Sequence, residues 1–330
     1  MSTKETLAGR RDGVLVKPAW IRVRVGEEGA YVETLSRLRA HRLHTVCEEA
    51  LCPNRSHCWS HGRATILILG DQCTRRCRFC NVAKRVAHPP DPDEPARVAA
   101  AVRDSGLREI VLTSVTRDDL PDGGAALWAE TIRRVHGDLE PPTLRSDILV
   151  EVLVPDFGGN RSAWQVVADA RPEIFGHNLE TAPRLYAQVR PEADYRRSLD
   201  LLRFASDAGL ITKTSLMLGM GETRDEIAQT LRDARDAGVR IFYAGQYLQP
   251  SAAHLPVVRY LSPAEFDDIG SVARGMGFDF VASAPLVRSS FHEEGQSEVV
   301  RKAQGPARNL LDEVSPAPFP RRANVAGTKH

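Results

Sequence analysis

Cysteine is absent from most of this 330-residue chain, and its distribution is informative. All six cysteines lie between Cys47 and Cys80, and none follows towards the C-terminus. Disulfides are disfavoured in a reducing cytosol, so this crowding favours metal or cluster ligation over structural cross-links. Structural cysteines are the weaker alternative.

Long apolar runs and a dominant sign of charge are also missing. No apolar stretch approaches the ~18 residues of a membrane span, and the start MSTKETLAGRRDG has no apolar secretory segment. We therefore expect a cytoplasmic protein that does not bind membranes. Lys and Arg number 44 against 43 Asp and Glu, so no basic excess indicates nucleic acid as a partner.

Six β-rich apolar runs alternate with amphipathic segments from Ala64 onward. They cover residues 64–70, 109–115, 147–154, 173–180, 212–219 and 240–248. Buried strands that alternate with helices predict right-handed crossovers and a parallel sheet. The predicted fold is α/β, a partial (β/α)6 TIM-like barrel with N-terminal and C-terminal extensions. An open doubly wound sheet is the alternative, but the first run lacks the following glycine pattern of a dinucleotide fold.

Local signals predict further elements. Residues 223–226 (TRDE) and 262–265 (SPAE) fit helix capping boxes, the second with Pro at the first helical position. Residues 20–25 alternate apolar and polar side chains, which predicts an edge strand. Residues 302–330 carry Pro, Ala and charge without periodicity, which predicts a mobile tail.

The strongest motif is CTRRCRFC, which spaces Cys73, Cys77 and Cys80 as C-x3-C-x2-C. Three thiolates this close, just after the first predicted strand, can bind one small inorganic core but leave one coordination position open. A structural zinc site is the alternative, and it needs a fourth protein ligand. Candidates for that ligand are His57, His61 and His88.

A second triad consists of Cys47, Cys52 and Cys58, spaced C-x4-C-x5-C. These spacings are loose for zinc, and Pro53-Asn54 would turn the chain between ligands, as a wrap around a larger core requires. We therefore expect a second cluster, in an environment different from that of the first.

The spacing of the CTRRCRFC cysteines resembles the signature of the radical S-adenosylmethionine superfamily. The resemblance implies that they hold a [4Fe–4S] cluster whose remaining iron binds S-adenosylmethionine. An electron from that cluster would cleave the cofactor to a 5′-deoxyadenosyl radical. Phe79 stands where the superfamily has an aromatic residue, and a core position for its ring is compatible with this role.

Longer segments resemble the lipoyl synthase family over about residues 18–292. In chain order they are CEEALCPN, CTRRCRFCNVAK, TSVTRDDLPDGGA, HNLETAPRLYAQVRPEADYRRSL, TKTSLMLGMGET, QYLQPSAAHLPVVRY and LVRSS. The resemblance implies insertion of two sulfur atoms at C6 and C8 of a protein-bound octanoyl-lysine. Because these carbons are unactivated, a radical oxidant is required. The second cluster is implied as the sulfur source, consumed in the reaction.

The resemblance also implies a fourth ligand for this auxiliary cluster, which we map to Ser290 within the sequence 288–291 (RSSF). Spacing alone does not distinguish Ser290 from Ser289, and a surface turn or helix cap is the alternative for both. The family usually has Tyr where this chain has Phe291, so any hydrogen bond of a phenol at this position is absent.

Polar residues at the ends of predicted strands are candidates for the S-adenosylmethionine site, because the carboxyl ends of strands face the reaction in α/β barrels. They are Thr113, Ser114, Asn178, Glu180 and Gly219. Asn178 and Glu180 could bind ribose hydroxyls or the ammonium group, with helix capping as the alternative. Gly219 would let the backbone approach the nucleoside closely.

Three further features are interpreted as structural and without a role in the site. The charged loop 117–119 (RDD) is interpreted as a solvated turn, with only the family resemblance hinting at a site role. His177 and His254 are interpreted as structural histidines.

The predicted organisation is an N-terminal extension (1–62) with the auxiliary-cluster cysteines, a radical S-adenosylmethionine barrel with the serine element (63–292) and a mobile tail (293–330). The implied partners are an octanoylated carrier, either glycine cleavage H protein or a 2-oxoacid dehydrogenase E2 subunit, an electron donor such as ferredoxin or flavodoxin, and an iron–sulfur carrier for cluster repair. The alternatives are another dual-cluster radical enzyme, such as a methylthiotransferase, or a non-catalytic iron–sulfur protein.

Overall fold

The computed structural model describes residues 10–11, 14–23, 28–61, 63–105, 109–137, 148–290 and 294–304. Within these ranges, the central sheet has eight strands in the order β10-β9-β8-β7-β6-β5-β4-β3. Strands β4 to β10 pair in parallel, and β3 is antiparallel to β4 at one edge. No pairing among the described strands joins β3 to β10, so the barrel is open, as predicted.

All six predicted strands are confirmed. They are β4 (Thr65–Ile68), β5 (Glu109–Ser114), β6 (Leu149–Leu153), β7 (Ile174–Gly176), β8 (Ile211–Leu218) and β9 (Ile241–Gln246). Their near-continuous burial is typical of a parallel sheet covered on both faces. Two edge strands escaped prediction, β3 (His44–Thr45) and β10 (Phe280–Ser283), as did a separate pair, β1 (Arg10–Arg11) and β2 (Val14–Leu15).

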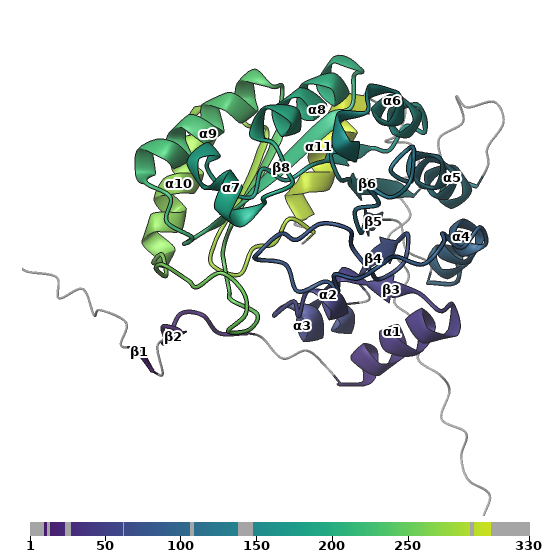
Figure 1. The fold of residues 1–330 in the computed structure, drawn as a ribbon, viewed down its shortest axis with the longest axis horizontal. Coiled ribbons are helices and arrows are strands. Elements are labelled where there is room, and N and C mark those ends of the chain that lie inside the picture. Colours follow the sequence, from purple (N-terminus) through teal and green to yellow (C-terminus); the bar gives the residue numbers. More distant parts are fainter. Residues whose placement is uncertain are drawn as a thin grey trace, which may run out of the picture.

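An arc of helices covers the outer face of the sheet (Figure 1). They are α4 (Glu94–Ser105), α5 (Ala125–Val135), α6 (Arg161–Asp169), α8 (Tyr195–Asp207), α9 (Arg224–Asp236) and α10 (Pro263–Gly275). Both predicted capping boxes are confirmed, at Thr223 before α9 and Ser262 before α10. Short helical turns η1 (Phe157–Gly159), η2 (Pro183–Leu185) and α7 (Tyr186–Val189) follow β6 and β7. None of the described helices is long and apolar enough to cross a membrane.

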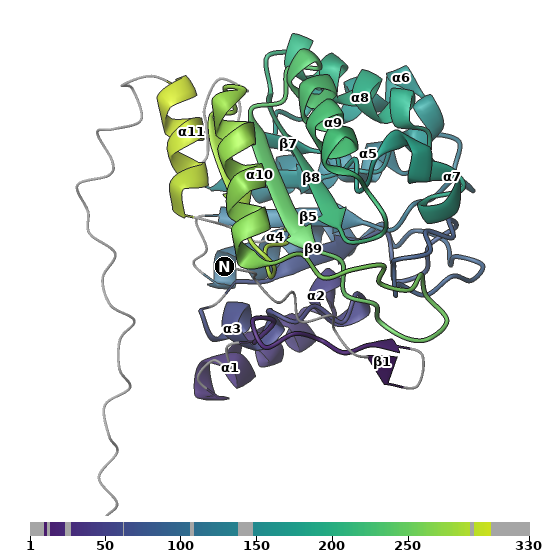
Figure 2. The same cartoon turned by 90° about the vertical axis from the view of Figure 1, so that its left-hand side faces the viewer.

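Three N-terminal helices lie at the β3 edge of the sheet (Figures 1 and 2). They are α1 (Glu28–Ala40), α2 (Val46–Glu49) and α3 (Arg55–Ser60). Trp59 is fully buried and stacks on Tyr31, with ring centroids 5.1 Å apart. This contact packs α3 against α1, and Trp59 joins the segment that carries the second cysteine triad to the main core of the barrel.

The edge strand predicted for residues 20–25 is wrong for residues 20–23, which form no strand. Trp20 and Val23 are each 44% exposed, and the indole of Trp20 donates its hydrogen bond to the Leu261 carbonyl instead. Alternation alone did not supply a neighbouring strand with which to pair. Residues 24–25 lie outside the described ranges.

The mobile tail predicted for residues 293–330 is wrong for residues 294–304, which form helix α11 (Glu294–Gln304). Its buried face contains Gln296, whose side-chain oxygen accepts a hydrogen bond from the buried Lys213 amine at 2.7 Å. A polar residue at the centre of the packed face hid the apolar periodicity. Residues 305–330 lie outside the described ranges.

Candidate functional site

A cavity of about 480 Å³ opens at the carboxyl ends of the parallel strands. Its walls come from the ends of β5, β6 and β8 and from the loops after β4, β7 and β9. This is where α/β barrels place their reactive groups. The residues that line it include Cys52, Cys73, Cys77, Cys80, Thr113, Ser114, Asn178, Glu180, Arg190, Arg288, Ser289 and Ser290.

The loop after β4 brings Cys73, Cys77 and Cys80 to this cavity as free thiols. The Cys73 amide donates to the Ala83 carbonyl at 2.8 Å, which closes the base of the loop. The Thr116 amide, just after β5, donates to Cys73 Sγ at 3.3 Å. The first triad is therefore held on a loop whose sulfur atoms face open space.

Burial raises the pKa of two of these thiols, Cys77 and Cys80. The pKa of Cys80 rises to about 12. The pKa of Cys77 is also raised by burial, and the nearby Arg190 cation opposes this rise. Because metal ligands are thiolates, cluster assembly must release these protons.

The second triad faces a second cavity, of about 250 Å³, inside the open barrel. Cys47, Cys52, Cys58 and Ser290 all line it. Cys52, Arg288 and Ser290 line both cavities, so the two cavities share these residues as walls. Burial raises the pKa of Cys47, and it raises that of Cys58 to about 12.

Long-range hydrogen bonds bring the fourth candidate ligand to this triad. Asn54, in the turn between Cys52 and Cys58, donates from Nδ2 to the Leu286 carbonyl at 2.7 Å, 232 positions further along the chain. The contact holds the segment that carries Ser290 against the cysteine loop. A second bond, from Asn81 Nδ2 to the Glu49 carbonyl at 2.8 Å, joins the segments of the two triads.

The two adjacent serines have different surroundings. Ser289 lines only the central cavity, and its Oγ lies 2.9 Å from Asn178 Nδ2, from which it accepts a hydrogen bond. Ser290 lines the second cavity together with all three cysteines of its triad. This difference separates two residues that spacing alone left equivalent.

Four of the five residues predicted for S-adenosylmethionine line the central cavity, namely Thr113, Ser114, Asn178 and Glu180. Thr113 Oγ1 donates to the Leu153 carbonyl, and Ser114 Oγ accepts from the Trp128 indole. Both side chains are therefore used within the barrel wall. Asn178 is different, because its Oδ1 is buried and accepts no hydrogen bond from the described residues.

Glu180 has an unusual backbone at the cavity wall, with φ of +67°. Such a conformation is uncommon for a residue other than glycine and is held here by its neighbours. Its amide donates to the Ser215 carbonyl and its carbonyl accepts from the Met217 amide. Burial raises the pKa of the Glu180 carboxyl, and Arg190 opposes the rise.

Gly219, the fifth candidate, does not line the central cavity. A Cβ there would lie 2.2 Å from Gln246 Nε2 and 2.5 Å from the Arg259 carbonyl oxygen, at a φ of +105°. Glycine is therefore required at this position because Gln246 and the Arg259 carbonyl pack against it, and a nucleoside is not what approaches it.

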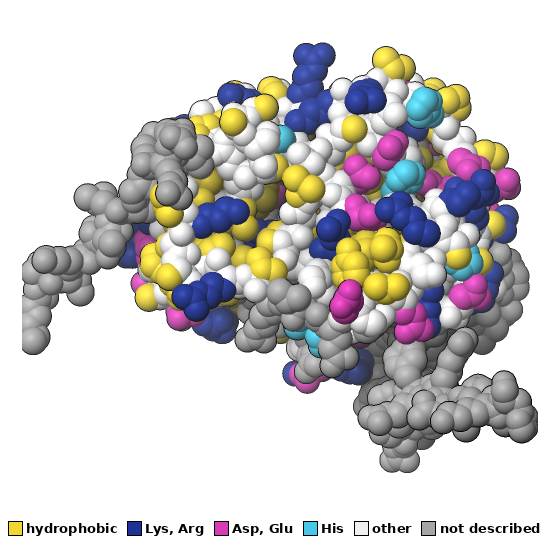
Figure 3. Space-filling model, turned by 90° about the horizontal axis from the view of Figure 1, so that it is seen from below, with side chains coloured by type: hydrophobic (Ala, Val, Ile, Leu, Met, Phe, Trp, Pro, Cys, Tyr) yellow, Lys and Arg dark blue, Asp and Glu magenta, His cyan; other side chains and the backbone are white. Residues whose placement is uncertain are grey.

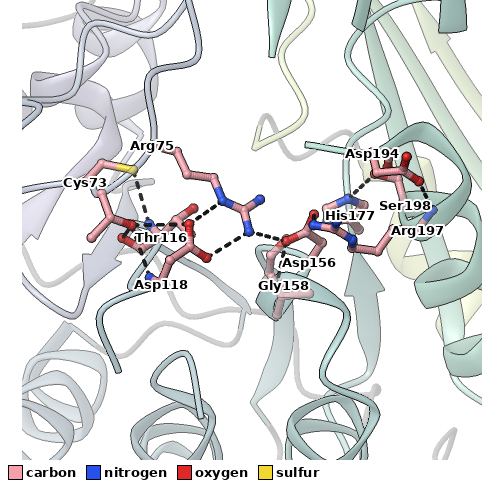
Figure 4. A network of polar contacts seen from close by, with 12 residues as sticks. Cys73, Arg75, Thr116, Asp118, Asp156, Gly158, His177, Asp194, Arg197 and Ser198 are labelled. Atoms are coloured by element: carbon pink, nitrogen blue, oxygen red, sulfur yellow. Dashed lines mark hydrogen bonds and ion pairs between the residues drawn. The ribbon is translucent and has the colours of Figure 1, made fainter. Parts of the chain in front are cut away.

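The charged loop 117–119 is solvated only in part, because Asp118 and Asp119 are exposed whereas Arg117 is buried. The Arg117 side chain is only 2% exposed and pairs with Asp119 at 2.8 Å. Asp118 accepts two hydrogen bonds from Arg75, which itself lies between two cysteines of the first triad (Figure 4). Arg117 therefore finds its partner within the loop, whereas Asp118 finds Arg75 in the loop after β4.

Arg75, Asp156 and Arg190 are charged residues of the site that the sequence did not single out. Arg75 and Arg190 line the cavity, and Asp156 pairs with Arg75 at 2.6 Å. Although burial opposes it, the Arg75 partner lowers the pKa of Asp156 to about 2. Arg190 donates to the Asn178 carbonyl at 2.7 Å. Only Arg75 could have been found from the sequence, because it lies in the same motif as Cys73 and Cys77.

Both histidines interpreted as structural have partners on their rings. His177 has Val154 O at 2.8 Å and Ser198 Oγ at 3.0 Å, and His254 has Cys80 O at 3.2 Å and Ser251 Oγ at 2.8 Å. Among the described residues, no three or more His, Cys, Asp or Glu side chains are arranged to hold a single metal ion.

Sequence comparison identifies the family. The Radical SAM superfamily matches residues 67–234, which contain the first triad and strands β5 to β8. Lipoyl synthase of Methylococcus capsulatus is 53% identical over 87% of this chain and 88% of its own length. The chain belongs to the lipoyl synthase family. The family's enzymes from Pelodictyon phaeoclathratiforme and Rubrobacter xylanophilus are 50% and 48% identical, over 84% and 88% of this chain and 93% and 90% of their own lengths.

Solved structures agree on the fold. Streptococcus suis SuiB bound to S-adenosylmethionine superposes with a TM-score of 0.51 at 12% identity, over 76% of this chain and 55% of its own. HydG, a maturase of the [FeFe]-hydrogenase, gives 0.50 at 13% identity, over 85% and 68%. These likenesses confirm the open α/β barrel.

Family membership implies a [4Fe–4S] cluster and S-adenosylmethionine as cofactors. The residues present fit both groups. Three free thiols face the central cavity, which has room for a ligand beside them, and Asn178 Oδ1 offers an unused acceptor. Cys73, Cys77 and Cys80 would hold the cluster, with the nucleoside between the strand ends.

Proposed function

We propose that this chain inserts two sulfur atoms at C6 and C8 of an octanoyl group carried on a protein lysine, giving lipoyl-lysine, and that each cysteine triad binds one [4Fe–4S] cluster. The observation that carries the proposal is that the two cavities are neighbours, with Cys52, Arg288 and Ser290 in the walls of both. A substrate chain in the central cavity would reach both triads without leaving the protein.

The first triad provides the radical chemistry. When bound, the cluster and S-adenosylmethionine supply a 5′-deoxyadenosyl radical that can abstract hydrogen from an unactivated carbon. Thr113, Ser114, Asn178 and Glu180 form the wall against which the nucleoside would lie, and Asn178 Oδ1 would accept its hydrogen bond. Apolar side chains of Phe79, Leu153 and Val154 complete the lining and exclude water from the radical.

The second triad provides the sulfur. Cys47, Cys52, Cys58 and Ser290 would bind a cluster that acts as a substrate and loses sulfur on each turnover. An oxygen ligand matches a cluster iron less well than a thiolate does, so the iron on Ser290 would leave more readily once sulfur is removed. The position of Ser290 in the same cavity as the three cysteines supports this choice over Ser289.

The carrier protein would approach the mouth of the central cavity. Lys17, Leu51 and Lys84 line the cavity and are all exposed, Leu51 by 58%. They combine apolar contact with positive charge at the entrance, which suits a protein that presents an acylated lysine. Figure 3 shows the face below the sheet, where hydrophobic side chains lie among charges of both signs. An H protein or an E2 subunit would be this partner. Ferredoxin or flavodoxin would donate the electrons, and an iron–sulfur carrier would rebuild the second cluster. We expect the reaction to take place in the cytoplasm.

The test is a single-turnover assay under anaerobic conditions. The chain is reconstituted with iron and sulfide, reduced, and given S-adenosylmethionine and an octanoylated carrier peptide. We expect roughly eight irons per chain before turnover, then 5′-deoxyadenosine and lipoyl peptide by mass spectrometry, with iron and acid-labile sulfide lost from the second site. Cleavage without any sulfur insertion would favour another radical enzyme, such as a methylthiotransferase. Failure to form 5′-deoxyadenosine would favour the non-catalytic alternative.

A further inference from the structure

Two neighbouring arginines in the loop of the first triad have opposite environments. Arg75 is buried, with 5% of its side chain exposed, whereas Arg76 is exposed. Both lie between Cys73 and Cys77 and carry the same charge. The sequence makes them look equivalent, so the burial of one requires a physical reason.

Arg75 connects the cysteine loop to two loops of the barrel (Figure 4). Its Nε and Nη2 donate to the two carboxylate oxygens of Asp118, at 2.7 and 2.8 Å. Nη2 also lies 2.6 Å from Asp156 Oδ1. The Asp156 side chain has no exposed surface and is further paired with Arg197 at 3.2 Å. A planar guanidinium fits such a fork-like arrangement, which an ammonium cannot reproduce.

The same two segments are joined next to the sulfur. Thr74 Oγ1 donates to the Thr116 carbonyl at 3.0 Å and accepts from the Asp118 amide at 3.1 Å. One residue away, the Thr116 amide donates to Cys73 Sγ at 3.3 Å. Arg75 and its carboxylate partners therefore fix the segment whose backbone amide points at a cysteine of the first triad.

We propose that Arg75 is a positioning residue for the first cluster, because its pairs with Asp118 and Asp156 hold the Thr116 amide against Cys73 Sγ. Hydrogen bonds to cluster sulfurs are one of the factors that set the reduction potential. A donated hydrogen bond stabilises the more negative, reduced state, so its loss lowers the potential. The inference rests on the proposed assignment of Cys73, Cys77 and Cys80 to the radical cluster.

The experiment compares Arg75→Gln with its matched control Arg76→Gln in the full, reconstituted chain. The midpoint potential is measured by electron paramagnetic resonance on the signal that changes when S-adenosylmethionine is added. For Arg75→Gln we expect a lower potential and a fall in kcat for cofactor cleavage on the order of 100-fold, the size expected for a small misplacement of reacting groups. KM should change far less. Arg76→Gln should match the unaltered chain in every measurement.

Two more variants keep the test decisive. Arg75→Lys retains the charge without the fork and should give intermediate values. Asp118→Asn removes the bidentate partner at a side chain that is 40% exposed, so it should fold even where Arg75→Gln does not, and it should lower the potential too. An unchanged potential in Asp118→Asn, or equal effects in the Arg75 and Arg76 variants, would overturn the proposal. An unaltered chain that never cleaves S-adenosylmethionine would instead refute the proposed function.

Discussion

The two cysteine triads differ in how the chain completes them. The first is local, since one loop after β4 carries Cys73, Cys77 and Cys80 to the cavity. The second is spread over α2, a turn and α3, and its fourth candidate ligand, Ser290, comes from the segment after β10. A local site forms with its loop, whereas the second site depends on docking two distant segments.

The supports of the two triads differ in the same way. Buried ion pairs of Arg75 with Asp118 and Asp156 anchor the first loop to the barrel. Neutral hydrogen bonds from Asn54 and Asn81 hold the second segment in place, together with an ion pair of Glu48 with Arg39, whose side chain is 64% exposed. Charge-assisted bonds are roughly twice as strong as neutral ones. This difference matches the proposal that the first cluster persists while the second is consumed.

The sharpest way to break this comparison is to remove one thiol from each triad. Cys77→Ala should abolish cleavage of S-adenosylmethionine, because the radical cluster loses a ligand. Cys52→Ala should leave cleavage measurable and stop sulfur insertion. Each variant should bind roughly four irons instead of roughly eight. Equal loss of cleavage in both folded variants would contradict the division of labour.

The next largest effect separates the adjacent serines. Ser290→Ala should reduce sulfur insertion on the order of 10- to 100-fold, since loss of a group that supports a metal typically costs that much. Ser289→Ala removes only a hydrogen bond from Asn178 and should keep the iron content of both sites. Product and iron analysis of the two variants side by side decides between them, and a greater loss for Ser289→Ala would reverse the assignment.

A third prediction concerns the stability of the chain in acid, which should depend on the buried His177 at the wall of the central cavity. Burial, together with the Arg190 cation, lowers the pKa of His177 from 6.5 to about 4. As pH falls, the unfolded chain takes up this proton first. The free energy of unfolding therefore keeps its full value above about pH 6.5 and falls by about 3 kcal/mol towards pH 4. Urea titrations of the chain without clusters at pH 7 and 4.5 measure it. His177→Gln should flatten this part of the profile, and an unchanged slope would contradict the expectation.

The smallest expected effect concerns the tie that completes the second triad. Asn54→Ala removes the bond to the Leu286 carbonyl and should cost about 1 kcal/mol of unfolding free energy. Iron should be lost selectively from the second site, while the midpoint potential of the first cluster stays unchanged. Equal iron loss from both sites would show that the two triads share one support.

Much of the barrel could be predicted because its signals are local. The run 64–70 is a buried strand because it is continuously apolar, and the capping box at Thr223 needs only neighbouring residues. Failures arose where the partner was distant. Helix α11 packs through Gln296 against Lys213, and residues 20–23 lack a strand beside them.

The candidate site shows the same difference between features set by local sequence and features set by distant contacts. Four of the five residues predicted for S-adenosylmethionine line the cavity because parallel strands bring their carboxyl ends together. Gly219 stands apart because Gln246 and the Arg259 carbonyl fill the space beside it. Arg75 escaped attention because nothing local distinguishes it from Arg76.

The sequence by itself determined the cysteine spacings, the alternating strands and helices and the family, because these are properties of short or collinear segments. Only the tertiary structure decided that Ser290 lines the same cavity as the second triad, that Arg75 pairs with two carboxylates and that the two cavities share wall residues. Such contacts join residues far apart in the chain, and their energies exist only once the barrel has brought them within hydrogen-bonding distance.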